Sequence, residues 1–234
     1  MNIRSLAHLS FFALAIALPA CGGTADTGAF FDWGIVDVGA PDTAPFLNCD
    51  ESVGIGATVV LEAQDLSRGG APQTFSYPCA AGGGNVPGLL AGQYSMTVRL
   101  LRADNIAVSS LPLGTVSVAR RGQTDLGVIV FEIQSLSLNW LIKQASNLNA
   151  PVTCAAVGAT QVELTVTAAT QAPTVFRFPC TNGQGQTQAV TVGAYVISAR
   201  LLNAVGSELS NLSLDFVTPD NTPALLPLVT FTVN

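Results

Sequence analysis

The stretch FDWGI at residues 31–35 returns as LNWLI at residues 138–142. Other landmarks recur in the same order: YPC at 77–79 as FPC at 178–180, GQY at 92–94 as GAY at 193–195, and RLL at 99–101 as RLL at 200–202. A repeat of about 100 residues has the size of one small domain. The sequence therefore predicts two copies of one unit, residues 30–133 and 137–234, with almost no linker and restricted motion between them.

Within each copy, apolar and polar residues alternate with the period of a β-strand. Residues 94–100 (YSMTVRL) put Tyr, Met, Val and Leu on one face, and residues 195–201 (YVISARL) repeat the arrangement. Glycine-rich runs such as residues 82–85 (GGGN) interrupt any helical pattern. About seven short strands per copy predict an all-β fold of two tandem antiparallel β-sandwich domains.

This strand pattern resembles the immunoglobulin-like or transthyretin-like kind of sandwich. The immunoglobulin hallmark places a tryptophan between two cysteines, whereas Trp33 precedes Cys49 and Trp140 precedes Cys154. The resemblance therefore extends to the sandwich and not to the hallmark. Tyr77, two residues before a cysteine, would suit a tyrosine corner, but its counterpart is a phenylalanine without a hydroxyl, so that motif is not assigned.

The loops of the two copies differ more than their strands. Asp50-Glu51 of the first copy correspond to Ala155-Ala156 of the second, and Gly82–Gly84 are aligned with Asn182–Gln184. Divergence of this kind is expected where loops carry recognition.

Residues 1–20 form a signal peptide, with one early positive charge and a short apolar run. The run is too short to span a bilayer. The residues LPAC at 18–21 resemble the lipobox of bacterial lipoproteins. The resemblance implies cleavage before Cys21, lipidation of that cysteine, and a short tether over residues 21–29. Ordinary secretory cleavage, leaving a free thiol, is the alternative. The residue after Cys21 is glycine, which does not look like an inner-membrane retention signal, so the outer membrane is favoured.

The other four cysteines divide evenly between the copies. If the strands after Cys49 and before Cys79 form a hairpin, both cysteines lie at its open end, and Cys154 and Cys180 are equivalent. An exported chain meets an oxidising compartment, so two disulfides are predicted, Cys49–Cys79 and Cys154–Cys180. A zinc site would need four ligands in one place, which two thiols and no histidine do not supply.

Composition excludes several classes of function. The mature chain contains no histidine, because His8 lies in the signal peptide. This argues against histidine-dependent catalysis and histidine metal ligands. Eight Lys and Arg face fifteen Asp and Glu after cleavage, which disfavours nucleic acid as a partner. No cofactor and no catalytic residue is assigned.

Several carboxylates precede the first lysine or arginine of the mature chain, which raises the possibility of a calcium site. Asp32, Asp50 and Glu51 are the candidate ligands, but no Asp-x-Asp-x-Asp loop is present and the second copy has alanines at 155 and 156. No metal site is therefore predicted. Arg99 and Arg200 are expected on matching outward faces, pairing with carboxylates of a neighbouring strand, and a shared ligand site is the alternative.

The sequence allows two interpretations for each of two further sets of residues. Trp33 and Trp140 could stack on sugars, but both alternate in phase with buried residues, which favours core packing. Thr165, Thr167 and Thr191 suit either an adhesive face or an ordinary exposed strand.

The predicted function is a non-enzymatic, membrane-anchored surface or periplasmic lipoprotein with a structural, adhesive or ligand-binding role. Its partner would be an unknown protein or glycan. One alternative is a carbohydrate-binding or calcium-dependent adhesion module, which an exposed Trp33 or Tyr94 would favour. The other is a glycoside hydrolase that uses carboxylates alone, which requires two carboxyl groups about 5 to 10 Å apart in a cleft.

Overall fold

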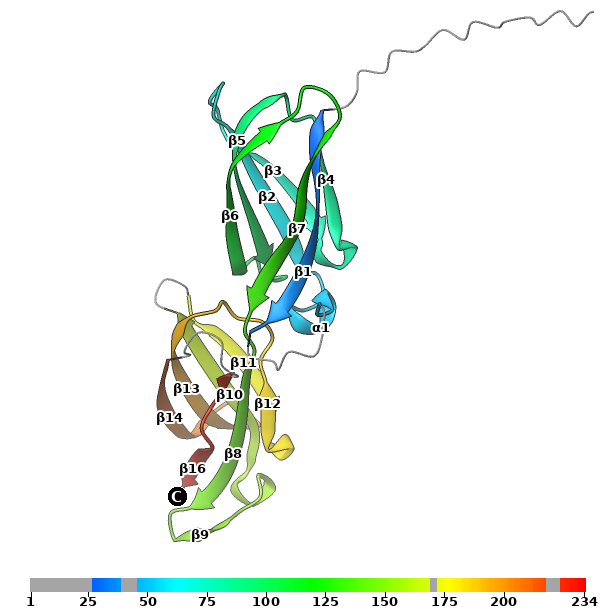
Figure 1. Cartoon of the computed structure of the whole chain (residues 1–234). Coiled ribbons are helices and arrows are strands. Elements are labelled where there is room, and N and C mark those ends of the chain that lie inside the picture. Colours follow the sequence, from blue (N-terminus) through cyan, green and yellow to red (C-terminus); the bar gives the residue numbers. More distant parts are fainter. Residues whose placement is uncertain (1–26, 39–45, 169–171, 218–223) are drawn as a thin grey trace, which may run out of the picture.

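The structure is a computed structural model of the 234-residue chain, and it describes residues 27–38, 46–168, 172–217 and 224–234. The described chain forms two β-sandwiches arranged end to end (Figure 1). The predicted all-β fold is therefore confirmed. The predicted signal peptide and Cys21 lie outside the described residues. No helix of the described residues has the length and apolarity needed to cross a membrane.

The described residues of the first sandwich form seven strands in two sheets. One sheet has the order β4-β1-β7, formed by Gly83–Pro87, Gly28–Asp37 and Gln123–Ile133. The other has the order β3-β2-β5-β6, formed by Gln73–Pro78, Thr58–Asp65, Gly92–Leu101 and Ala107–Val118. Two short helical turns, α1 (Cys49–Ser52) and η1 (Cys79–Ala81), lie where the hairpin of β2 and β3 opens.

The second sandwich repeats this plan. Its four-stranded sheet has the order β11-β10-β13-β14, formed by Thr174–Pro179, Ala159–Ala168, Ala194–Asn203 and Glu208–Val217. The opposing sheet centres on β8 (Leu136–Gln144), which pairs with β9 (Asn147–Pro151), β12 (Gln184–Gln186), β15 (Ala224–Leu225) and β16 (Val229–Val233). The helical turns are η2 (Ala155–Val157) and η3 (Cys180–Asn182).

Most strand pairs of the described residues are antiparallel, as predicted, but the first and last strands of each sandwich pair in parallel. Trp33 of β1 lies opposite Ile129 of β7, and Trp140 of β8 lies opposite Val229 of β16. Lettered in chain order, the first sandwich has sheets D-A-G and C-B-E-F, whereas an immunoglobulin domain has ABED and CFG. The immunoglobulin-like strand topology is therefore wrong for this protein, and the transthyretin-like topology is the predicted alternative that remains. Alternation in a sequence tells which face of a strand is buried but not which strand is its neighbour.

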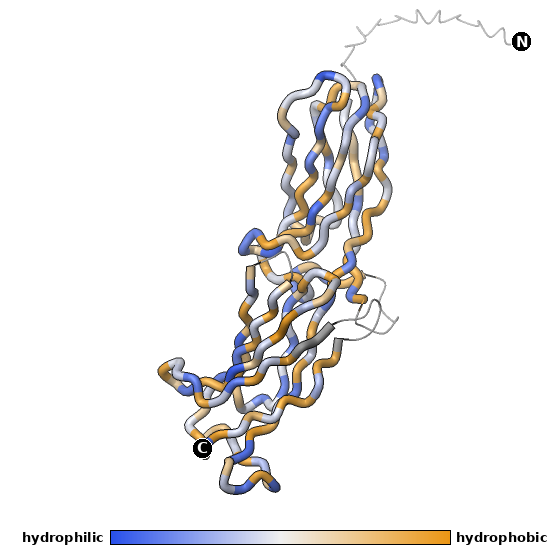
Figure 2. Tube along the Cα trace, turned by 90° about the vertical axis from the view of Figure 1, so that its left-hand side faces the viewer, coloured by the Kyte–Doolittle hydropathy of each residue, from blue (hydrophilic) through white to orange (hydrophobic). Residues whose placement is uncertain are grey.

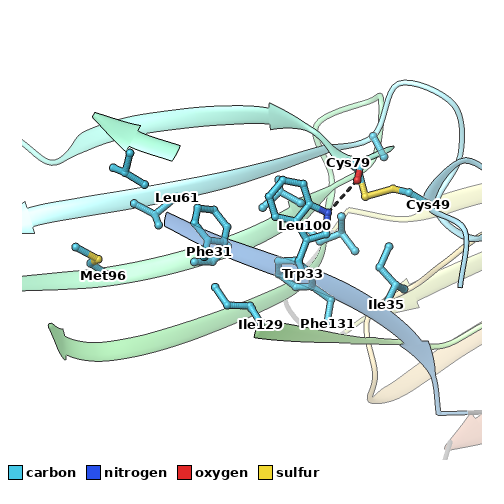
Figure 3. Close-up of a cluster of buried hydrophobic side chains, with 14 of the residues drawn as sticks. Phe31, Trp33, Ile35, Cys49, Leu61, Cys79, Met96, Leu100, Ile129 and Phe131 are labelled. Carbon is cyan, nitrogen blue, oxygen red and sulfur yellow. Dashed lines mark hydrogen bonds between the residues drawn. A yellow bond between two sulfur atoms is a disulfide. The ribbon is translucent and has the colours of Figure 1, made fainter. Parts of the chain in front are cut away.

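Two hydrophobic cores fill the space between the sheets. In the first, Phe31 and Trp33 on β1 pack with Phe131 on β7 and with Leu61 and Met96 of the opposing sheet (Figure 3). In the second, Leu138, Trp140 and Ile142 on β8 take the equivalent places. Along the trace, hydrophobic and hydrophilic residues alternate within strands of both sandwiches (Figure 2). This alternation is the sequence pattern expected for strands with one buried face.

The glycine-rich runs align differently from the sequence-based expectation. Gly82 and Gly183 both terminate a helical turn in the left-handed conformation, with φ angles of 69° and 67°. Gly84 and Gly185 both lie against an aromatic ring, so that a Cβ would come within 2.8 Å of Tyr77 or 2.5 Å of Phe178. The predicted alignment of Gly82 with Asn182 is therefore wrong by one residue, because the glycines keep the same structural roles.

The two sandwiches meet in a tight seam. Residue Gln134 pairs through its backbone with Val190 at 3.1 and 2.8 Å, and the amide of Ala189 donates to the carbonyl of Ser52 at 2.9 Å. Ala189 belongs by contact to the core of the first sandwich although the repeat assigns it to the second copy. The end of the first sandwich that carries α1 therefore packs against the end of the second sandwich where β8 begins.

Candidate functional site

The predicted disulfides are both present. Cys49 bonds to Cys79 and Cys154 to Cys180, with Cα–Cα distances of 5.9 and 6.0 Å. Each bond closes the open end of a hairpin, β2 with β3 in the first sandwich and β10 with β11 in the second. These four cysteines are therefore structural, and none of them supplies a thiol for chemistry.

The two tryptophans are core residues. Trp33 is 7% exposed and Trp140 4%, and Tyr94 is fully buried. The indole N–H of Trp33 donates to the carbonyl of Cys79 at 2.9 Å, drawn as the dashed line in Figure 3. These rings are therefore unavailable as sugar-stacking platforms, and the exposed aromatics that would favour a carbohydrate-binding module are not found at these positions.

The candidate calcium ligands do not form one group. Asp32 lies on the outward face of β1, opposite Gly83 of β4. Asp50 and Glu51 lie in the first turn of α1, at the seam. Among the described residues, no cluster of three or more His, Cys, Asp or Glu side chains could hold a metal ion. Asp32 on β1 and the pair Asp50 and Glu51 in α1 therefore do not form a common calcium site.

A groove of about 370 Å³, lined by both polar and apolar side chains, lies at the seam. Its lining includes Asp37 and Glu51 from the first sandwich and Gln186 and Gln188 from the second. Asp37 accepts hydrogen bonds from the backbone N–H of Ser135, at 3.3 Å, and from the Ser135 hydroxyl. Asp37 therefore fastens the connection between the sandwiches. Carboxylates and amides in a groove can accept and donate to the hydroxyl groups of a small polar ligand.

A second groove, of about 320 Å³, lies at the seam beside Arg102. The Arg102 side chain is buried, pairs with Asp104, and lies 5.8 Å from the ring centroid of Phe176 in the other sandwich. The hydrogen bond from Arg102 holds the pKa of Asp104 below its ordinary value, against the effect of burial. The pair and the ring together join the two sandwiches through a cation–π contact.

A row of charged residues crosses the outward face of the second four-stranded sheet. Glu163 on β10 lies directly opposite Arg177 on β11 and Arg200 on β13. Its carboxylate is 1% exposed and accepts from both guanidinium groups, at 2.9 Å from Arg177 Nε and 3.0 Å from Arg200 Nε. Burial opposes ionisation of Glu163, but the hydrogen bonds from Arg200 and Arg177 outweigh it and lower its pKa.

The predicted pairing of the matching arginines is present, with a difference between the copies. Arg99 pairs with Glu62, which is one pleat away along β2, whereas Arg200 pairs with a glutamate directly across. The position directly across from Arg99 is Val60. The sequence pattern predicted the outward face of these residues. Arg177 as the second partner of Glu163 was missed, because the hairpin of these two strands was expected without its register.

The far end of the second sandwich is formed by the hairpin of β8 and β9, the turn between β13 and β14, and η3 (Figure 1). Leu148 and Val205 lie in the first two of these and are 52% and 84% exposed. Threonines 165 and 167 are partly exposed on the outward face of β10. The molecule therefore offers two kinds of accessible surface away from the seam, a far end with exposed apolar residues and sheet faces rich in hydroxyl groups.

No family model and no curated protein matches the chain. Among solved structures, a proposed adhesin from Bacteroides ovatus ATCC 8483 is 8% identical, with a TM-score of 0.43 over 88% of this chain and 93% of that one. Another from Bacteroides ovatus is 9% identical, with a TM-score of 0.43 over 89% and 88%. The fimbrial anchor protein Mfa2 from Porphyromonas gingivalis is 11% identical, with a TM-score of 0.39 over 81% and 83%. Similarity at this level assigns no function to the chain.

Proposed function

We propose that this protein is a lipid-anchored, non-enzymatic surface or periplasmic lipoprotein that holds a binding surface away from a bacterial membrane. Residues 30–133 and 137–234 would be its two units, and Cys21 its lipidation site, with the outer membrane favoured. The partner would be a protein or a glycan. The observation that carries the proposal is the end-to-end order of the sandwiches, in which the chain enters at one end and the exposed far end lies at the other (Figure 1).

The tether supports this geometry. Six residue steps separate Cys21 from Thr27, the first described residue before β1. A chain of that length reaches at most about 20 Å. Two or three acyl chains on Cys21 would hold the protein on the membrane, since each buried CH₂ contributes about 0.8 kcal/mol. The first sandwich would thus stay close to the bilayer and the second would project from it.

The seam supports a fixed projection. Backbone pairing of Gln134 with Val190, the Ser135–Asp37 contact and the Arg102–Phe176 contact join the sandwiches at separate points. A joint with several such contacts resists bending more than a flexible linker would. The second sandwich would therefore be presented at a defined distance.

Anchoring and presentation can be tested separately. Detergent partitioning of the mature protein beside Cys21→Ser should move only the variant to the aqueous phase. A photo-crosslinking amino acid at Leu148 or Val205 should capture a partner on intact cells, and the same amino acid at Gln123, which is exposed near the chain entry, should not. A wild-type protein in the aqueous phase would contradict the anchor. Equal capture from all three positions would contradict presentation by the far end.

One rival keeps a specific observation in its favour. Asp37 and Glu51 line the same groove, and a glycoside hydrolase working with carboxylates alone would need such a pair. The hydrogen bonds from Ser135 to Asp37 favour a structural role for this carboxylate instead. We therefore propose that the groove does not catalyse.

A further inference from the structure

We propose that the end of the first sandwich where the chain enters is itself a membrane-docking surface for anionic phospholipid, formed by Leu66, Leu90, Arg120 and Arg121. This surface is called the entry surface below. The inference rests on the proposed lipid anchor, because the anchor brings this end to the bilayer.

The topology gathers the four residues at one end. Gly28, at the start of β1, lies opposite Gln123 at the start of β7 and opposite Pro87 at the end of β4. Gly92, at the start of β5, lies opposite Val118 at the end of β6. The turns after β2, β4 and β6 therefore surround the point where the chain enters, as Figure 1 shows for the labelled strands.

Two leucines on these turns are exposed. Leu66 is 53% exposed and Leu90 56%, whereas the adjacent Leu89 is fully buried and anchors its turn in the core. Exposing these two leucines to water is unfavourable. The cost is removed if both side chains enter the interfacial region of a bilayer, because burial of apolar side chains away from water lowers the free energy. Exposed leucines at a water-facing end would have no such benefit.

The turns that carry the leucines are fastened together. The amide of Leu66 donates to the carbonyl of Gln93 at 2.9 Å, and the Arg68 guanidinium donates to the carbonyl of Ala91 at 3.2 Å. Asp65 accepts from the amides of Ser67 and Arg68 at 2.8 and 2.9 Å. The two leucines are thus held in place before any membrane contact, which lowers the entropy lost on docking.

The charge of the entry surface is opposite to that of the protein. The chain has a net charge of −6, yet the turn from β6 to β7 carries Arg120 and Arg121 in adjacent exposed positions. The other arginines of the described chain, residues 68, 99, 102, 177 and 200, each pair with a carboxylate. Arg120 and Arg121 pair with no carboxylate among the described residues. Two unpaired cations beside exposed leucines are complementary to a bilayer that contains phospholipids with a net negative charge.

The test uses the mature chain, residues 21–234, with Cys21→Ser, so that no acyl chain masks the contact. Sedimentation with phosphatidylcholine vesicles, with and without phosphatidylglycerol, measures binding. We expect binding that requires phosphatidylglycerol and weakens as salt rises. Arg120→Ser with Arg121→Ser should weaken it about thirtyfold, since each basic residue near an anionic surface contributes about 1 kcal/mol. Leu66→Ser with Leu90→Ser should weaken it severalfold at every salt concentration.

The matched control is at the far end of the molecule, where Lys143→Ser with Leu148→Ser removes one cation and one exposed leucine and should leave binding unchanged. Leu90→Trp should shift its fluorescence to the blue on vesicles, and Leu148→Trp should not. Binding equal on both vesicle types, a control pair as harmful as the arginine pair, or sedimentation without vesicles would overturn the proposal. Detergent partitioning of the acylated protein reports on the anchor independently, so failure here leaves that result intact.

Discussion

The indole of Trp33 and the carbonyl of Cys79 are joined by a 2.9 Å hydrogen bond that links the centre of β1 to one half of a disulfide. The backbone N–H of Trp33 donates to the carbonyl of Gly82 on the same turn, at 2.9 Å. Trp140 makes the same two bonds in the second sandwich, to Cys180 at 3.0 Å and to Gly183 at 3.0 Å. The tryptophan of the repeat therefore fastens one sheet to the disulfide of the other.

Removing the indole N–H should destabilise either sandwich by about 1–3 kcal/mol, because a buried hydrogen bond is lost and some core volume with it. Trp33→Phe and Trp140→Phe should cost similar amounts in urea unfolding. Benzothiophenyl-alanine at position 33 keeps the shape without the N–H and isolates the bond. A cost for Trp33→Phe with none for the analogue would show that packing alone matters there.

Peptide mapping without reductant should find Cys49 joined to Cys79 and Cys154 joined to Cys180. Replacing either pair by serine should lower the free energy of unfolding by about 3.5 kcal/mol, because each bond closes a loop of 30 or 26 residues in the unfolded chain. Any linkage between Cys49 and a cysteine of the second sandwich would contradict the structure.

Gly185→Ala should destabilise the second sandwich by about 1–3 kcal/mol, because its Cβ would come within 2.5 Å of the Phe178 ring in a packed layer. Gly92→Ala is the control, since a Cβ there meets no atom nearer than 3.6 Å. Thermal unfolding of both variants decides the matter. Equal melting temperatures for the two would show that the ring moves aside freely.

Glu163→Gln should cost roughly 1–3 kcal/mol at neutral pH, because two hydrogen bonds from arginines lose their charged acceptor. The folded pKa of Glu163 is lowered, so its stabilisation is present above the ordinary value of 4.5 and is lost as pH falls through the folded pKa. The free energy of unfolding should therefore fall less steeply with decreasing pH in the variant than in the wild type. Glu62→Gln, at a half-exposed pair, should cost below about 1 kcal/mol. A steeper fall in Glu163→Gln would contradict this account.

The purified mature chain should hydrolyse no glycoside, with or without calcium. If turnover is found, Asp37→Asn and Glu51→Gln identify whether the seam groove is responsible. Turnover lost in both variants, with the melting temperature of Glu51→Gln unchanged, would replace the non-enzyme proposal. A fall in melting temperature for Asp37→Asn is expected in any case, because its contact with Ser135 fastens the seam.

The sequence by itself determined the repeat, the strand character and the cysteine pairs. Alternation along residues 94–100 records which side chains are buried, because a strand turns successive residues to opposite faces. The recurrence of tryptophan and cysteine in the same order fixed two equivalent units. The charge and histidine content of the chain follow from counting alone.

Only the tertiary structure decided which strands are neighbours. The parallel pairing of β1 with β7 joins residues about 100 positions apart, and no local pattern records such a contact. The true alignment of Gly84 with Gly185 depends on aromatic rings of a different strand. The separation of Asp32 from Asp50, the two partners of Glu163 and the gathering of Leu66, Leu90, Arg120 and Arg121 at one end all follow from topology. Which residues lie close together in space depends on which strands pair. A single sequence indicates the buried face of each strand and the positions of turns, but it does not indicate which strands are neighbours.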